Sequence, residues 1–132
     1  MTTRDLSRDL DVAPSLHPAV RTDGTATGTA VDLRGVDAAT IALVWGAWSD
    51  GTHTPAIEES DDGTTFETVA AEDLSVPPVA LSGAGGAAKV QRIGYFGLSR
   101  YIRVRLTTSG AEDGAASAAL VLRGRAHRRP VG

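Results

Sequence analysis

Every second residue from Tyr101 to Leu106 is aliphatic, and the residues between them are Tyr or Arg. A period of two is typical of a strand that buries one face and exposes the other to water. Upstream, Asp62-Gly63 supplies the positive φ that a tight hairpin turn requires, between two stretches of strand-forming residues. These two features predict an all-β protein.

Turn signals divide the rest of the chain into further short strands, and the segment 40–48 is apolar on both faces, which indicates a central strand. The expected strands are 27–33, 40–48, 53–60, 65–70, 90–96, 101–107 and 116–125. Two packed antiparallel sheets satisfy such a pattern, so we expect a jelly-roll-like β-sandwich over residues 25–126. The predicted core consists of Ile41, Leu43, Trp45, Ile57, Phe66, Ile102, Val104, Leu106, Leu120 and Leu122.

Residues 1–24 are predicted to form an extended N-terminal arm, because apolar residues are sparse there and Pro14 and Pro18 prevent a long helix. Such an arm either becomes ordered on a partner or is a mobile tail. A short basic tail is expected at 127–132. The residues predicted to bind a partner are Leu6, Leu10, Val12, Leu16 and Val20 in the arm, and Arg123, Arg125, Arg128 and Arg129 near the C-terminus.

The charges are segregated along the chain. Residues 35–88 contain nine acidic residues and no Lys or Arg, whereas residues 89–132 contain nine basic residues and two acidic ones. One interpretation is that the two blocks pair across neighbouring strands. The other is that they form acidic and basic surfaces that dock onto other subunits. The basic block has no Lys-rich cluster with interleaved aromatic residues, so nucleic acid is not an expected partner.

No catalytic, metal-binding or cofactor-binding constellation is apparent, and we expect a protein that is not an enzyme. There is no cysteine, and His17, His53 and His127 lack metal-ligand spacing. The carboxylates near Asp62 suit calcium or a glycosidase, but turn chemistry also explains them. The N-terminus does not resemble a signal peptide, and the longest apolar run, about 40–48, is too short to span a membrane.

From about Asp5 to Pro130 the chain resembles small structural proteins encoded in the head and connector region of tailed bacteriophages. The segments that carry this resemblance are Pro18-Ala-Val20, 28–33, 50–53, 57–66, 92–95, 100–104 and the closing Arg-x-His-x-x-Pro at 125–130. The resemblance implies a capsid decoration or cement protein on the capsid exterior, made in the host cytoplasm. Its partners would be the major capsid protein and neighbouring copies of itself, in a dimer or trimer. A neck or tail component is the alternative within this class.

A second resemblance concerns two segments, Glu59-Ser-Asp-Asp-Gly-Thr-Thr-Phe66 and Arg100-Tyr-Ile-Arg-Val104. Both are similar to the corresponding hairpin and strand of discoidin-type jelly rolls, which bind carbohydrate or lipid. They cover about a third of the chain. They imply a jelly-roll-like sandwich, with carbohydrate binding or host adhesion as the alternative function.

Overall fold

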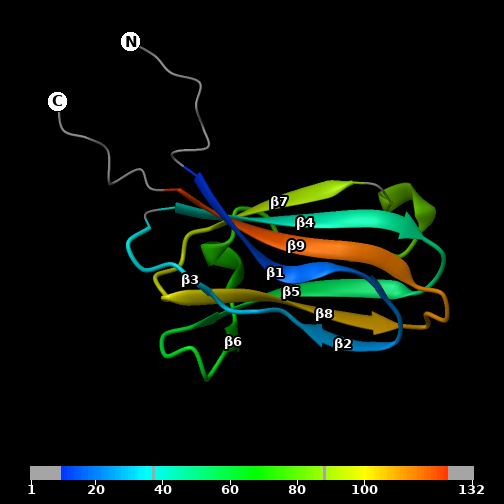
Figure 1. Cartoon of the computed structure of the whole chain (residues 1–132), viewed down its shortest axis with the longest axis horizontal. Helices are drawn as coiled ribbons and strands as arrows, with labels where there is room; N and C mark the ends of the chain where they lie inside the picture. The colour runs from blue at the N-terminus through cyan, green and yellow to red at the C-terminus, as the bar shows by residue number, and fades with distance from the viewer. Residues whose placement is uncertain (1–9, 37, 88, 125–132) are drawn as a thin grey trace, which may run out of the picture.

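The computed structural model describes residues 10–36, 38–87 and 89–124, and these residues form two packed β-sheets (Figure 1). The strands are β1 (Leu10–Arg21), β2 (Gly24–Thr27), β3 (Val31–Asp32), β4 (Ala38–Trp48), β5 (Thr52–Ser60), β6 (Glu67–Thr68), β7 (Val90–Tyr95), β8 (Tyr101–Ser109) and β9 (Ala115–Gly124). Two short 3-10 turns, η2 (Ala71–Asp73) and η3 (Ala84–Gly86), lie in the connections.

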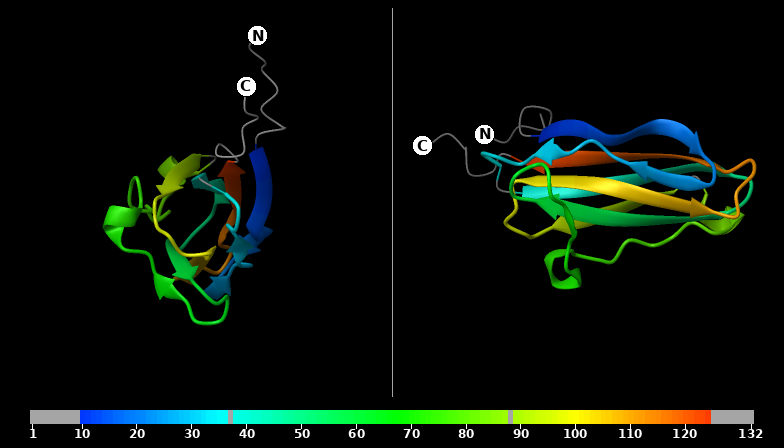
Figure 2. Two further views of the ribbon diagram at one scale, coloured as in Figure 1. Left: turned by 90° about the vertical axis from the view of Figure 1, so that its left-hand side faces the viewer. Right: turned by 90° about the horizontal axis from the view of Figure 1, so that it is seen from below.

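The two sheets have the topology of a jelly roll (Figures 1 and 2). Sheet A has the order β1-β9-β4-β7, and sheet B has the order β2-β8-β5-β6, with β3 also paired to β8. If β2 and β3 are taken as one interrupted strand, the first strand pairs with the last, the second with the next to last, and so on inward. A long hairpin folded over itself produces this order. The prediction of an antiparallel, jelly-roll-like sandwich is confirmed.

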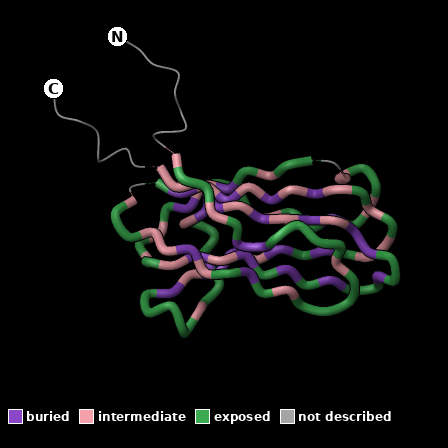
Figure 3. Tube along the Cα trace, viewed as in Figure 1, coloured by how far each residue is buried: buried purple, intermediate pink, exposed green. Residues whose placement is uncertain are grey.

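The core lies between the sheets, as the buried stretches in Figure 3 show. Seven of the predicted core residues are buried: Ile41, Leu43, Trp45, Ile57, Ile102, Val104 and Leu106. The prediction was wrong for Leu120 and Leu122, which face outward, because β9 turns Ala119 and Val121 inward instead. Alternation defines two sets of residues on a strand, but it does not say which set faces the core.

The prediction of an N-terminal arm was wrong for residues 10–24. Residues Leu10–Arg21 form β1, which pairs with β9 along the edge of sheet A, and β2 begins at Gly24. Pro14 and Pro18 are compatible with this position because an edge strand has one row of N–H groups without a ladder partner. The register of β1 shifts on both sides of Leu16, so the strand departs from simple alternation. Residues 1–9 and the tail 127–132 lie outside the described residues.

The predicted strand 27–33 is interrupted, and the interruption ties the two sheets together. The Gly28 N–H donates to the carbonyl of Val104 in sheet B, and the Thr29 N–H donates to the carbonyl of Ser15 in sheet A. Ser15 also accepts the N–H of Val104 on its Oγ, at 3.0 Å. A side chain on Gly28 would overlap Ser15 and the Val104 carbonyl, so the close approach requires glycine.

Candidate docking site

The outer face of sheet A is apolar. At its outward positions four strands contribute aliphatic or small side chains and a single charged one, Arg92. We call this surface the apolar face. Its residues are Val12, Pro14, Val20, Thr40, Ala42, Val44, Gly46, Val90, Arg92, Gly94, Ala116, Ala118, Leu120 and Leu122. The large side chains at its margins are well exposed, with Val12 at 51%, Val20 at 63% and Val90 at 58%.

The outer face of sheet B is polar and provides the comparison. Its strands alternate buried residues with threonines and charged residues, as in Thr25 and Thr27 of β2 and Thr54 of β5. An antiparallel sheet in a sandwich normally covers its solvent side with such polar groups. Sheet B follows this pattern and sheet A does not. Contiguous apolar surface on a folded protein marks a site of interaction.

Both edges of sheet A carry features that disfavour the addition of another strand. The β1 edge carries Pro14 and Pro18, which lack N–H donors. The β7 edge is covered by the segment before it: the Gln91 amide bonds both the N–H and the carbonyl of Val79, and the Ser75 N–H donates to the Gly94 carbonyl. The face of sheet A is therefore the better candidate for association with a partner than its edges.

The interpretation that the charge blocks pair across strands is confirmed at Glu58. This carboxylate, 8% exposed, accepts from Arg103 at 2.8 Å and lies 3.5 Å from Arg105, both on β8. The Arg103 guanidinium also stacks on Phe66, 3.7 Å from the ring centroid. Phe66, predicted as core, therefore covers a salt bridge on the outer surface of sheet B instead.

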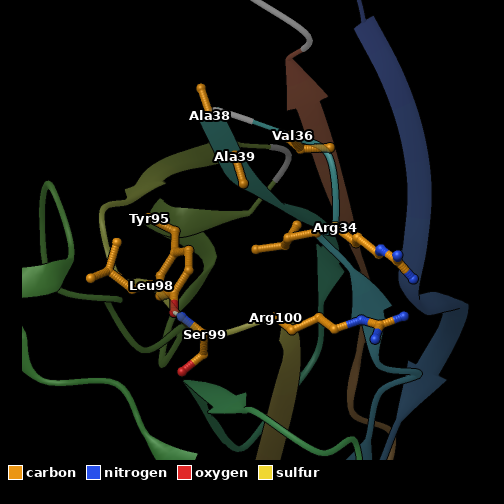
Figure 4. Close-up of a pocket in the computed structure, with 10 residues that line it drawn as sticks. Arg34, Val36, Ala38, Ala39, Tyr95, Leu98, Ser99 and Arg100 are labelled. Carbon is orange, nitrogen blue, oxygen red and sulfur yellow. Dashed lines mark hydrogen bonds between the residues drawn. The ribbon is translucent and has the colours of Figure 1, made fainter. Parts of the chain in front are cut away.

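A pocket of about 530 Å³ opens at the end of the sandwich where β4 begins and β7 ends (Figure 4). Its walls are Leu33, Val36, Ala38, Ala39, Tyr95, Leu98 and neighbouring backbone, with Arg34 and Arg100 at the rim. The Tyr95 hydroxyl donates to Glu59 at 2.6 Å and accepts the N–H of Ser99 at 3.1 Å. Burial and the bond to Glu59 raise the pKa of Tyr95 to about 12. The hydroxyl is thus a fixed structural contact of the pocket.

An ion pair fixes the rim of this pocket. Arg100 binds Asp32 with two hydrogen bonds, of 3.0 and 2.8 Å, and the Arg34 N–H donates to the same carboxylate. These donors, Arg100 first, lower the pKa of Asp32 to about 2. Arg34 is exposed, and among the described residues no carboxylate lies within salt-bridge distance of its guanidinium.

The acidic turn after β5 is held by its own hydrogen bonds. The Asp62 carboxylate accepts the N–H groups of Thr65 and Thr64 and the hydroxyl of Ser60, and these donors lower its pKa to about 2. This bonding matches the turn interpretation of the cluster. In the described part of the chain, no group of three His, Asp or Glu side chains is placed to hold a metal ion.

The predicted partner-binding residues separate in the structure. Val12 and Val20 lie on the apolar face, whereas Leu16 is buried in the core and Leu10 is half-buried at the start of β1. Arg123 bonds Asp11 and the carbonyl of Asp32 within its own sandwich. Leu6, Arg125, Arg128 and Arg129 lie outside the described residues.

Sequence reasoning missed the centre of the apolar face, which consists of Val44, Ala118 and Leu120. The signal was present, because β4 is apolar on both sides. His53, the first residue of the expected strand 53–60, is fully buried near the start of β5, with its ring nitrogens 3.1 Å from the Thr108 hydroxyl and from the Asp50 carbonyl. None of the helical segments among the described residues is long and apolar enough to cross a membrane.

Comparison with known proteins gives one structural likeness. No family model and no curated protein sequence matches the chain. A chain in the structure of infectious bursal disease virus, Gx strain, is similar over 92% of this chain and 34% of its own length, with a TM-score of 0.46 and 15% identity. This chain thus spans about a third of that one.

Proposed function

We propose that the protein is a non-enzymatic structural component of a virus particle that binds another particle protein through the apolar face. The observation that carries this proposal is the difference between the two outer faces of the sandwich, one polar and one apolar. The resemblance of the chain to structural proteins of tailed phages supports the same class of function. Burying apolar area is favourable by about 25 cal/mol per Å², so a protein partner is the natural cover for such a surface.

Within this class we propose the decoration or cement role, on the capsid exterior of a tailed phage. The partner would be the major capsid protein, through a flat, apolar part of its outer surface with at most a carboxylate opposite Arg92. The low charge of the apolar face suits this chemistry, because the centre of a stable interface is depleted of charged residues. Neighbouring copies of the protein are the second proposed partner, in a dimer or trimer.

The test introduces one charge at the centre of the apolar face. Val44→Glu places a carboxylate that would lose its hydration on docking, and the matched control Thr54→Glu places the same group on the outer face of sheet B. Both variants should keep the fold, as followed by thermal unfolding. Val44→Glu should then fail to bind particles that lack the protein, while Thr54→Glu binds like the wild type. Equal binding of the two variants would refute docking through the apolar face.

The number of copies per particle separates the decoration role from its alternatives. A decoration protein should be present in tens to hundreds of copies over the shell, whereas a neck or tail component forms a ring of about six or twelve copies. Quantitative mass spectrometry of purified particles, together with imaging, distinguishes these outcomes. Titration of the isolated protein with glycans tests the carbohydrate-binding alternative. Saturable glycan binding, together with absence of the protein from particles, would refute the proposed function and favour carbohydrate binding.

A further inference from the structure

The loops 33–36, 60–67 and 96–100 lie at one end of the sandwich (Figure 2). Two surface regions that carry residues of opposite charge adjoin there. One is the pocket of Figure 4, with Arg34 and Arg100 at its rim, which we call the basic pocket. The other, the acidic cleft, measures about 250 Å³ and is lined by Glu59, Ser60, Asp61, Asp62, Thr65 and Glu67. Ser99 lines both regions, so they share a border.

The basic pocket is formed before any partner binds. The Ser99 N–H is held by the Tyr95 hydroxyl, and a side chain on Gly97 would overlap the Tyr95 ring, so the loop lies tightly against its wall. The guanidinium groups of Arg34 and Arg100 extend to the same side (Figure 4). Leu98, beside the shared Ser99, is 100% exposed. Arg100 is paired with Asp32, so Arg34 carries the excess positive charge among the described residues that line the pocket. A cavity of mixed polar and apolar lining with this cationic rim fits an acidic segment that also carries apolar contacts.

A second copy of the chain supplies such a partner. In a two-fold symmetric contact both subunits use the same surface, so every contact occurs twice. If one residue of the first copy meets a second residue of the other copy, the second residue of the first copy also meets the first residue of the other. A surface that carries a basic region beside an acidic one then becomes its own complement, because each basic pocket faces the acidic cleft of the other copy. The border between the regions lies at the axis in this arrangement. This places Leu98 and Ser99 at the centre, where an exposed leucine is covered by its counterpart.

We propose that the protein self-associates end to end through this surface, with the basic pocket of each copy receiving the acidic turn 60–67 of the other. The proposal rests on the self-association included in the proposed function and identifies its surface. It is independent of docking through the apolar face, which remains free in such a dimer. The contact depends on charge, so added salt should weaken the dimer. At ionic strengths of about 0.1–0.15 M, charges are screened beyond about 8–10 Å.

Charge exchange tests the proposal on the full-length chain. Arg34→Glu sets carboxylates against the acidic cleft, and Asp61→Lys sets a cation against the basic pocket. Each variant alone should raise the dimer dissociation constant at least about tenfold in sedimentation equilibrium. An equimolar mixture of the two should restore the wild-type value, because each contact between the unlike copies again joins opposite charges. The matched controls Lys89→Glu and Glu112→Lys, at the opposite end of the sandwich, should behave like the wild type.

The same measurements define the results that overturn the proposal. A wild-type chain that stays monomeric at all accessible concentrations, single variants that associate like the wild type, or a mixture that fails to restore association would each exclude this surface. Val44→Glu separates the two proposals. If it abolishes particle binding and leaves the dimer intact, both proposals stand. If it abolishes the dimer, self-association occurs through the apolar face and the end-to-end contact is wrong.

Discussion

The hydroxyl of Ser15 offers a direct test of whether β1 belongs to the sandwich. Ser15 is 2% exposed and joins the two sheets: its Oγ donates to the Thr29 carbonyl at 2.9 Å and accepts the Val104 N–H at 3.0 Å. The bond occupies the gap between β2 and β3, where Val104 has no strand residue opposite it on that side of β8; its partner on the other side is Ile57 of β5. Ser15→Ala therefore leaves a buried N–H in sheet B without an acceptor.

The expected cost follows from that single group. Leaving a buried donor unsatisfied costs about 1–3 kcal/mol, against a total stability of about 5–15 kcal/mol for a domain of this kind. For a chain of this length each kcal/mol lowers the melting temperature by about 3–5 °C, so Ser15→Ala should unfold about 3–15 °C below the wild type. Urea unfolding should show a lower midpoint with an unchanged slope.

Val12→Ala is the matched control on the same strand. Val12 is 51% exposed, so its truncation should change the stability by no more than about 0.5 kcal/mol. If Ser15→Ala unfolds within about a degree of this control, β1 does not belong to the cooperative unit. The alternative interpretation of residues 10–21 as a docking arm would then be correct, and the sheet order described above would be wrong.

Three further predictions concern the turns and the basic pocket. Gly114→Ala should severely destabilise the fold, because φ is +77° there and a side chain would overlap the Arg21 carbonyl. Its control is Gly110→Ala, where φ is +68° but no atom lies close to the added methyl group. Thermal unfolding should show that the control loses only about 1–2 kcal/mol of stability. Asp62 has a pKa of about 2 in the fold and about 3.9 when unfolded, so its contribution is complete above about pH 4 and is lost as the pH falls towards 2. Acid unfolding curves of Asp62→Asn should lose that part of the pH dependence, and those of Asp61→Asn, which leaves the turn bonds in place, should keep it. Tyr95→Phe removes the hydrogen bonds to Glu59 and Ser99. It should lower the stability measured by urea unfolding by about 1–2 kcal/mol and speed hydrogen exchange in the loop 96–100. Exchange in that loop at the wild-type rate would argue against its attachment to the tyrosine.

The strands with a clean period of two were the most predictable part of the fold. In β8 the inward residues Ile102, Val104 and Leu106 alternate with polar ones, so both the strand and its buried side follow from the sequence. The β1 strand was missed for the opposite reason. Two prolines and two shifts of register disturb its alternation, and its buried residues Ser15 and Leu16 are adjacent in sequence. Only the pairing with β9, which is distant in sequence, identifies it as a strand.

The candidate site was predictable only in part, because its residues are defined by sheet order. Val12 and Val20 were expected to bind a partner as anchors of an extended peptide, but their role on the apolar face depends on the position of β1 beside β9. The basic pocket joins residues from loops that are far apart in sequence, such as Arg34 and Leu98. The charge blocks indicated that acidic and basic surfaces exist. They did not indicate that two of these surfaces share an end of the molecule.

The apolar pattern of β4 shows why a docking face is hard to recognise from sequence. Ile41, Leu43 and Trp45 face the core, and Ala42 and Val44 face outward, so both sides of the strand are apolar. In a single chain this pattern indicates a strand covered on both faces by its own fold. Here only one cover is present among the described residues, and the outward set aligns with Leu120 and Ala118 of β9 in one continuous surface. The hydrophobic periodicity is that of a three-layer structure, and the described residues supply two layers. In the proposed function, a partner protein supplies the third layer by covering the apolar face.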